Sequence, residues 1–288
     1  MKAKDYVNEI AKQVTSLMQE HGTDWAQPWI GKSYGMPYNP ARKARYTGSN
    51  VIGLMLYGYH AGFSSNEWAT YKQWQSIGRQ VTVGEKAKGR SNFYSTFEGK
   101  DGGDDYLVMR VSNVFNIEQT DNYEAPVIEN DDKVNEIEAV ETFLSNIPSS
   151  IKVGGNSAYF SITDDYIQMP PRNTFIDTKD ATATQNYYST LMHEHGHWTG
   201  HKSRLDRLPK NFDRQSLAFE ELVAELTSVL LSCHLGIEKR PTANHAKYLN
   251  NWVEAIKDNP RVIMKAMTAA EKAMTYLTDY QEQQVAAE

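Results

Sequence analysis

Apolar side chains recur every three to four residues in several stretches of the chain, a spacing that places them on one face of an α-helix. Helices with such a face are predicted over residues 4–21, 50–61, 65–77, 134–147, 182–198 and 217–235. The periodicity is lost between residues 25 and 46, where Pro, Gly and aromatic residues predict an irregular segment.

Strands are predicted by shorter runs rich in β-branched and aromatic residues. They lie at residues 80–83, 91–97, 106–115, 151–153, 158–162 and 166–169. An acidic stretch with few large apolar residues, 121–133, separates two groups of elements and predicts a linker. We therefore expect an α+β protein of two domains, residues 1–120 and residues 134–288.

Cysteine usage limits the classes of site that the chain can hold. Cys233 is the single cysteine among 288 residues, which excludes an internal disulfide framework, a four-cysteine zinc site and a CxxC redox pair. A lone cysteine fits a reducing compartment, so we expect a cytoplasmic protein. Because residues 1–10 carry charges and no run of about 18 apolar residues occurs, we expect neither a membrane-spanning helix nor a standard cleaved leader.

Charge is distributed unevenly along the chain, although the net charge is only −6. Residues 28–100 hold ten Lys and Arg against three acids, a balance of +7, whereas residues 101–145 hold two against twelve, a balance of −10. The basic stretch also holds 13 aromatic residues among its 73. Cations that follow phosphates, interleaved with rings that stack on unpaired bases, are what binding a single strand of nucleic acid requires.

Candidate contacts to a single strand of nucleic acid are therefore sought among the cations and aromatic residues of this basic stretch. They are Arg42, Lys43, Arg45, Tyr46, Trp68, Tyr71, Lys72, Arg79, Lys86, Lys88 and Arg90. Two other interpretations stay open here. Aromatic residues in such a stretch are commonly core residues, and the cationic loop 84–90 also fits a solvated hairpin tip.

One motif carries recognisable metal chemistry. His193, Glu194 and His197 spell HExxH near the end of a predicted helix, with Gly200 as its stop. Two imidazoles four residues apart share a helix face and can hold Zn²⁺, or another divalent metal such as Mn²⁺, with a third protein ligand and a water. Glu194 is then placed to take the proton of that water as a general base. His195 points to another side of the helix and is expected to be structural.

Three residues are candidates for the third metal ligand. His201 lies one turn further along and reaches the metal only if the helix is interrupted. The longer HExxHxxGxxH pattern fails, because Ser203 stands where its last His belongs. Segment 221–225 resembles the glutamate helix of gluzincins, which implies that Glu221 is the ligand and that Glu225 holds a ligand imidazole by a hydrogen bond. The adjacent Glu220 is expected to interact with the dipole at the start of its helix.

Short segments in both halves of the chain occur in a characteristic order. In the N-terminal half they are Tyr46-Thr47-Gly48-Ser49-Asn50, Trp68-Ala69-Thr70-Tyr71-Lys72-Gln73, Gly84-Glu85-Lys86 and Val114-Phe115-Asn116. In the C-terminal half they are Tyr166-Ile167-Gln168-Met169-Pro170, HExxH with Thr199-Gly200-His201, and Glu221-Leu222-Val223-Ala224-Glu225. Together they resemble the ArdC antirestriction family. The resemblance implies a domain that binds single-stranded DNA, a gluzincin-like metallopeptidase domain, an origin on mobile elements, and an edge strand at residues 166–169 beside the substrate cleft.

The sequence therefore predicts an antirestriction protein of a conjugative plasmid or mobile element. We expect this protein to bind single-stranded DNA and to carry a zinc metallopeptidase-like domain that hydrolyses amide bonds with Glu194 as general base. The alternative is a DNA-binding protective protein whose metal site is structural and proteolytically inactive; a peptidase without a nucleic-acid role is a third class. Several residues are candidates for stabilising the oxyanion, namely Tyr187, Tyr188, His201 and Arg204.

Overall fold

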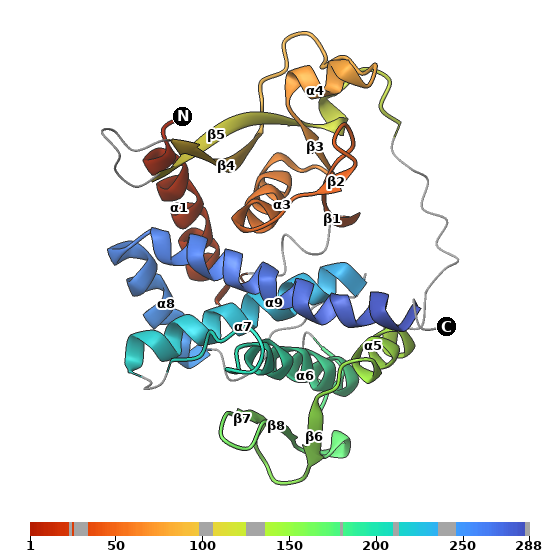
Figure 1. Ribbon diagram of the computed structural model, residues 1–288, viewed down its shortest axis with the longest axis vertical. Helices are drawn as coiled ribbons and strands as arrows, with labels where there is room; N and C mark the ends of the chain where they lie inside the picture. Colours follow the sequence, from red (N-terminus) through yellow and green to blue (C-terminus); the bar gives the residue numbers. More distant parts are fainter. Residues whose placement is uncertain are drawn as a thin grey trace.

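The computed structural model describes residues 1–22, 25, 34–97, 106–124, 136–178, 181–209, 213–235 and 246–285. Within these residues the chain forms a mixed sheet at one end, a group of helices in the middle and a small sheet at the other end (Figure 1). This arrangement confirms the predicted α+β class. None of the described helices has the length and apolarity that a membrane crossing requires.

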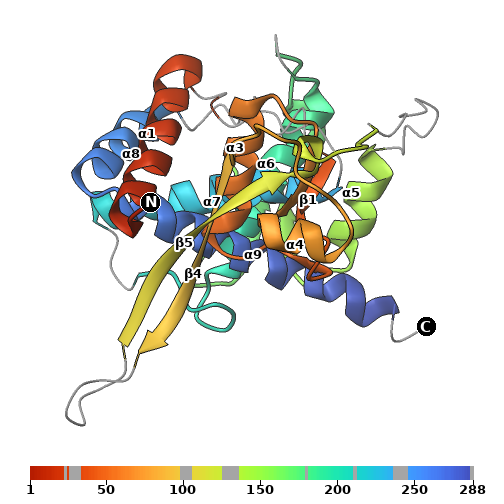
Figure 2. The same cartoon turned by 90° about the horizontal axis from the view of Figure 1, so that it is seen from above.

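The N-terminal half is built around a five-stranded sheet with the strand order β2-β1-β3-β5-β4. Its elements are α1 (Ala3–His21), β1 (Tyr34–Asn39), β2 (Ala44–Arg45), α3 (Ser49–Ala61), β3 (Ser65–Ala69), α4 (Tyr71–Ser76), β4 (Gly89–Phe97), β5 (Tyr106–Asn116) and the 3₁₀ turn η3 (Ile117–Gln119). Helix α3 packs against β3 and β4. β4 and β5 form a long antiparallel hairpin that extends outward from the body of the molecule (Figure 2).

Residues 65–77 form strand β3 followed by helix α4, and not the predicted continuous helix. Asn66 and Trp68 are buried at alternate positions, as a strand in the middle of a sheet requires. Thr70 then starts α4 with a capping box, in which its hydroxyl accepts from the Gln73 N–H while the Gln73 side chain accepts from the Thr70 N–H. The pairing of β3 with β1 and β5 therefore overrides the helical spacing of its apolar residues.

Two further local predictions are corrected in this half. The segment 25–46, predicted to be irregular, contains strands β1 and β2, which pair antiparallel; its residues 26–33 lie outside the described part. The predicted strand 80–83 is reduced to a single bridge between Val81 and Thr120. The predicted strands 91–97 and 106–115 are confirmed as β4 and β5.

The C-terminal half consists of a helical group and a three-stranded sheet of order β6-β8-β7. Its elements are α5 (Glu136–Ser145), β6 (Ser150–Val153), β7 (Tyr159–Ser161), β8 (Tyr166–Met169), the 3₁₀ turn η4 (Arg172–Thr174), α6 (Ala183–Thr199), α7 (Arg214–Leu235), α8 (Ala246–Asp258) and α9 (Arg261–Val285). The predicted helices and strands of this half are confirmed in α5, β6, β7, β8, α6 and α7. Helices α8 and α9 are not among the predicted elements.

The two halves share one hydrophobic core. Helix α1, the first described element, packs against α8 and α9, the last two described helices, and α3 also packs against α9 (Figure 1). Buried residues such as Ile10 of α1, Leu54 of α3 and Met267 of α9 belong to the same apolar cluster. The predicted linker 121–133 lies outside the described residues from 125 onward, and the domain boundary stays a prediction.

Candidate metal centre

Helix α6 carries the HExxH motif and ends directly after it. Thr182 caps the start of the helix through a capping box, and Gly200 is the C-cap. A side chain at position 200 would approach the Arg207 guanidinium to 2.8 Å and Leu208 to 3.0 Å. The predicted stop at Gly200 therefore coincides with a close approach of the segment that follows the helix.

The distance between α6 and α7 is set by two small residues. A Cβ atom at Gly196 would lie 2.9 Å from the Cα of Ala224 and 3.2 Å from its Cβ. Such distances are shorter than van der Waals contact, so the helices can approach this closely only with glycine on α6. Gly196 lies inside HExxH, and Ala224 lies between Glu221 and Glu225. The close approach therefore brings the histidines of one helix to the carboxylates of the other.

Three side chains converge between the helices. His193, His197 and Glu221 each offer a ligand atom, and these atoms lie within 4.8 Å of one another. The two Nε2 atoms are 3.1 Å apart, and oxygens of Glu221 lie 3.6 Å from His193 Nε2 and 3.8 Å from His197 Nε2. Bonds of about 2.0 to 2.1 Å in a tetrahedral site separate two ligand atoms by about 3.3 Å. The donor set and its spacing therefore fit a divalent ion with one position left for water.

Each of the two imidazoles, His193 and His197, has a buried carboxylate near its Nδ1 atom. Nδ1 of His193 lies 3.8 Å from Oε2 of Glu225, and Nδ1 of His197 lies 3.1 Å from Oε1 of Glu220. The Glu225 and Glu220 side chains are 1% and 3% exposed. A carboxylate at Nδ1 fixes the ring with Nε2 toward the metal and raises its basicity.

Glu220 was expected to interact with the dipole at the start of its helix, and this expectation is wrong. Helix α7 starts at Arg214, so Glu220 lies beyond its first turn and faces the interior. Arg207 donates to its two oxygens, from Nη2 at 2.8 Å and from Nε at 2.9 Å. Burial alone would raise the pKa of Glu220, but Arg207 and His197 outweigh burial and lower it. The sequence gives no sign of the pairing between Glu220 and Arg207, because only the fold brings the segment after α6 onto α7.

The carboxylates around His193 favour a proton on its imidazole. Burial lowers the pKa of this imidazole, but its contacts with Glu221 and Glu225 and the charge of Glu194 outweigh burial and raise the pKa to about 10. The surrounding carboxylates thus create a site that stabilises positive charge. A divalent cation would take the place of that proton.

Glu194 lies between this cluster and strand β7. It is 6% exposed, it accepts a hydrogen bond from the backbone N–H of Phe160, and its Oε2 atom has no hydrogen-bond partner among the described residues. Burial raises the pKa of Glu194, while His193 and His197 oppose the shift. A buried carboxylate oxygen beside the ligand cluster fits a water bound to a metal ion there.

His195 is structural, as expected from its position on α6. It is fully buried, with Nδ1 2.8 Å from the Leu191 carbonyl oxygen and Nε2 2.9 Å from Oγ of Ser149. Burial lowers the pKa of its imidazole to about 4, so the ring is neutral near pH 7.

The candidates for oxyanion stabilisation lie around α6, and all four have polar partners of their own. These partners are Ser203 for His201, Asp165 for Arg204, Glu141 for Tyr188 and Arg172 for Tyr187. Tyr187 packs edge-on against Phe175. His201 is not one of the residues that converge on the metal cluster.

The strand beside Glu194 is β7. Residues 166–169, which form β8, were expected to be the edge strand, and this expectation is wrong. β8 is paired on both sides, in parallel with β6 and antiparallel with β7. Its backbone groups are therefore occupied within the sheet. Of the three strands, β7 is the edge whose Phe160 reaches Glu194.

Both halves of the chain match models of known protein families. Residues 4–136 match the family model of the N-terminal domain of anti-restriction factor ArdC, and residues 138–270 match that of a zincin-like metallopeptidase. The Mn(II)-bound crystal structure of the antirestriction ArdC protein from plasmid R388 is 34% identical, with a TM-score of 0.75, over 95% of this chain and 97% of that chain. The chain belongs to the ArdC antirestriction family. The Mn(II) in that relative and the zincin-like domain indicate a divalent-metal site in this ArdC-family chain.

Two other proteins are similar to this ArdC-family chain over most of its length. Protein y4eC of Sinorhizobium fredii strain NGR234 is 29% identical over 286 residues, which are 95% of this chain and 91% of that protein. DNA primase TraC of Escherichia coli is 31% identical over 306 residues, which cover 98% of this chain. The chain spans only 28% of the length of TraC.

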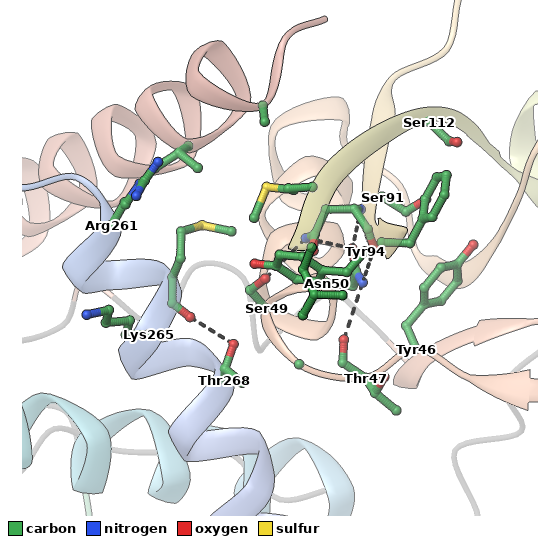
Figure 3. A pocket seen from close by; sticks show the side chains of 18 of the residues that line it. Tyr46, Thr47, Ser49, Asn50, Ser91, Tyr94, Ser112, Arg261, Lys265 and Thr268 are labelled. Atoms are coloured by element: carbon green, nitrogen blue, oxygen red, sulfur yellow. Dashed lines mark hydrogen bonds between the residues drawn. The ribbon is translucent and has the colours of Figure 1, made fainter. Parts of the chain in front are cut away.

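The ArdC-type N-terminal half borders a groove of about 1810 Å³, which lies between its sheet and helices α1 and α9 (Figure 3). Three of the predicted DNA contacts, Arg42, Arg45 and Tyr46, line this groove. Arg42 and Arg45 are exposed, and the Tyr46 hydroxyl donates to the Trp68 carbonyl oxygen at 3.0 Å. Lys43 is exposed in the turn between β1 and β2.

The other predicted DNA contacts are not part of the groove lining. Tyr71, Lys72, Lys86 and Lys88 are exposed elsewhere, whereas Arg79 and Arg90 are half-buried and hydrogen-bond within the N-terminal half. Trp68 was predicted to contact DNA, and this prediction is wrong, because its side chain is 0% exposed. A Cβ at Gly89 would lie 2.6 Å from the Trp68 ring, so β4 passes directly over it.

Proposed function

We propose that this ArdC-family protein binds single-stranded DNA and that its C-terminal domain hydrolyses amide bonds. One observation carries the hydrolytic part. The Oε2 atom of Glu194, buried and without a hydrogen-bond partner among the described residues, lies beside the three converging side chains of His193, His197 and Glu221. This combination supports a general base next to a metal-activated water.

His193, His197 and Glu221 would hold Zn²⁺, or another divalent metal such as Mn²⁺. When bound, such an ion polarises a carbonyl group and lowers the pKa of a bound water to about 7. Glu194 accepts a proton from the attacking water and later donates it to the leaving amine. The carboxyl group must keep the proton between these steps, and burial of Glu194 favours the protonated form.

Three further residues keep the proposed ligands in place. Glu225 and Glu220 hold the two imidazoles from behind, and Arg207 keeps Glu220 ionised. Substitution of such outer partners typically weakens metal affinity or activity by about 10- to 100-fold.

The single-stranded-DNA part of the proposal is supported by the family and by the distribution of charge. Residues 28–100 carry a balance of +7 from ten cations and three acids, and Arg42, Arg45 and Tyr46 lie together at one groove. Cations combined with aromatic faces suit a flexible strand with unpaired bases.

The substitution Glu194→Gln tests the hydrolytic part. It keeps the volume of the side chain and the three metal ligands but removes the base. We expect cleavage of fluorescein-labelled casein by the metal-loaded protein to slow by about 10²- to 10⁴-fold, with metal content and DNA affinity unchanged. Equal cleavage by the variant and the unsubstituted protein would rule out Glu194 as the base.

Transfer of plasmid DNA into a restricting recipient distinguishes hydrolysis from simple occupancy of DNA. If Glu194→Gln protects the incoming DNA as well as the unsubstituted protein does, protection comes from DNA binding and the metal site is structural. For the DNA part, a labelled oligothymidylate is titrated at several salt concentrations. The logarithm of its affinity must fall with the logarithm of salt, by about 0.7 per phosphate contact.

A further inference from the structure

We propose that single-stranded DNA lies in the groove between the β4–β5 hairpin and helix α9, so that the metallopeptidase-like half supplies one wall of the DNA site. This inference rests on the proposed DNA-binding function and assigns its place. In Figure 3, Arg261, Lys265 and Thr268 of α9 face Ser49, Asn50 and Tyr94 of the N-terminal half across the groove.

The charge of the groove selects an anionic occupant. Seven of its lining residues are Lys or Arg, of which Arg207 is paired with the buried Glu220, and no Asp or Glu is among the described residues that line it. This holds although the whole chain has a net charge of −6. A cleft lined by one sign of charge focuses its field on the opposite charge.

The cations of α9 form a row along one face of the helix. Arg261, Lys265 and Lys272 are spaced by four and seven residues, which keeps them on one side, and all three are exposed. With a rise of about 1.5 Å per residue, the row is about 16 Å long. Thr268, between them, lies close to Gly48, where a Cβ would come 3.8 Å from its hydroxyl. An extended chain of phosphates can follow such a row, whereas a single small anion uses one part of it.

Helix ends add to the positive character of the groove. The first residues of α1, α3 and α9 all line it, through Ala3, Ser49 and Arg261. The N-terminal end of a helix carries a partial positive charge and unpaired N–H groups. Three such ends around one cationic groove reinforce the preference for phosphates.

The size of the groove and an exposed tyrosine ring favour a nucleic-acid strand over a small metabolite. The volume of about 1810 Å³ exceeds the usual range of small-ligand pockets, about 300 to 1,000 Å³. Tyr94 on β4 is 58% exposed, and Leu107 across the hairpin is 66% exposed. Tyr94 lies on the same strand face as Asn92, whose side chain donates to Ser49 and Asn50 and so ties β4 to the start of α3. The ring is therefore held over the groove, where an unpaired base can stack on it.

A pair of double variants of the full chain tests the α9 wall. Lys265→Gln/Lys272→Gln removes two charges from the groove, and Lys12→Gln/Lys257→Gln removes two exposed lysines of helices α1 and α8 that do not line it. With labelled oligothymidylate as probe, we expect the groove pair to lower affinity on the order of tenfold at 0.1 M salt and to make the salt slope shallower by about 1.4. The control pair should change neither quantity by a comparable amount.

The substitution Tyr94→Leu tests the groove without a change of charge. Loss of one stacked base should lower affinity by about fivefold or more with the salt slope unchanged, whereas Tyr159→Leu, an exposed tyrosine on β7 that is 45% exposed, should leave affinity unchanged. If the unsubstituted protein binds DNA and both groove variants bind like their controls, this inference is wrong and the proposed function stands. If the unsubstituted protein does not bind at any salt concentration, the proposed DNA-binding function itself fails.

Discussion

Two guanidinium nitrogens of Arg207 donate hydrogen bonds to the carboxylate oxygens of Glu220, at 2.8 and 2.9 Å. One oxygen of the same carboxylate lies 3.1 Å from Nδ1 of His197. Arg207 also donates to the carbonyl oxygen of Gly196. One side chain from the segment after α6 therefore connects both helices that carry the metal cluster. Its contacts position His197 without touching the metal position themselves.

Replacement of Arg207 by Met should weaken the metal centre and the fold together. Glu220 is 3% exposed at its side chain, and removal of one partner of a buried ion pair costs about 3 to 5 kcal/mol. We expect the free energy of unfolding to fall by about 3 kcal/mol, the lower end of this range, because His197 still contacts Glu220. Metal affinity should be about 10- to 100-fold weaker. Chelator competition and denaturant unfolding measure the two effects.

The matched control for that substitution is Arg172→Met. Arg172 pairs with Glu141 at 2.8 Å, but the two side chains are 61% and 47% exposed. Exposed pairs contribute about 0 to 1 kcal/mol. Similar losses in both variants would contradict the role assigned to burial of Glu220.

The third ligand can be identified by metal content. We expect Glu221→Ala to lose the metal after dialysis, because two imidazoles alone do not complete the site. His201→Gln should retain it, since His201 bonds Ser203 and lies outside the cluster. The reverse pattern, with metal retained by Glu221→Ala and lost by His201→Gln, would show that the helix end rearranges to bring His201 in.

The substitution Gly196→Ala should push apart the two helices that form the cluster. Its Cβ would lie 2.9 Å from the Ala224 backbone, and overpacking of this kind costs about 1 to 3 kcal/mol. Metal affinity should fall with stability. Gly58→Ala on α3 is the control, because the nearest described atom to a Cβ there lies in the Trp68 ring at 3.6 Å, and Gly to Ala inside a helix is stabilising by up to about 1 kcal/mol. Equal destabilisation of both variants would show that the helix contact at Gly196 is not special.

Acid should destabilise the metal-free protein through His195. Its folded pKa of about 4 is below the unfolded value of about 6.5, so the unfolded chain binds the proton first as the pH falls. The contribution is complete above pH 6.5 and is lost toward pH 4, by a total on the order of 3 kcal/mol. His195→Gln should lower stability at pH 7 and flatten this pH dependence, as measured by urea unfolding. An unchanged dependence would mean that His195 does not titrate between these values.

The convergence of His193, His197 and Glu221 was largely predictable from the sequence, because helical periodicity turns spacing into position. His193 and His197 are four residues apart, as are Glu221 and Glu225, so each pair shares one helix face wherever the helices lie. Glu220 could not be assigned in the same way. Its partner Arg207 comes from an irregular segment, and no local pattern places such a residue.

Segment 65–77 shows the limit of periodicity more clearly. Its apolar positions suit a helix, yet Trp68 fills the core from a strand that is paired on both sides. The local sign of the true boundary is Thr70 with Gln73, a capping box that starts a helix only at Tyr71. The groove was beyond prediction for a related reason, because its walls come from residues about 200 positions apart and meet only in the folded chain.

The packing of α1 against α8 and α9 has a consequence for synthesis of the protein. The ribosome releases residues 3–21 well before helices α8 and α9, which cover part of the apolar face of α1 and follow it by more than 200 residues. Ile10, Val14 and Leu17 are fully or almost fully buried in the finished structure. Until residues 246–285 have been made, this face has the cover that α3 and β5 give it, but the part facing α8 and α9 stays exposed to aggregation or is held by a chaperone.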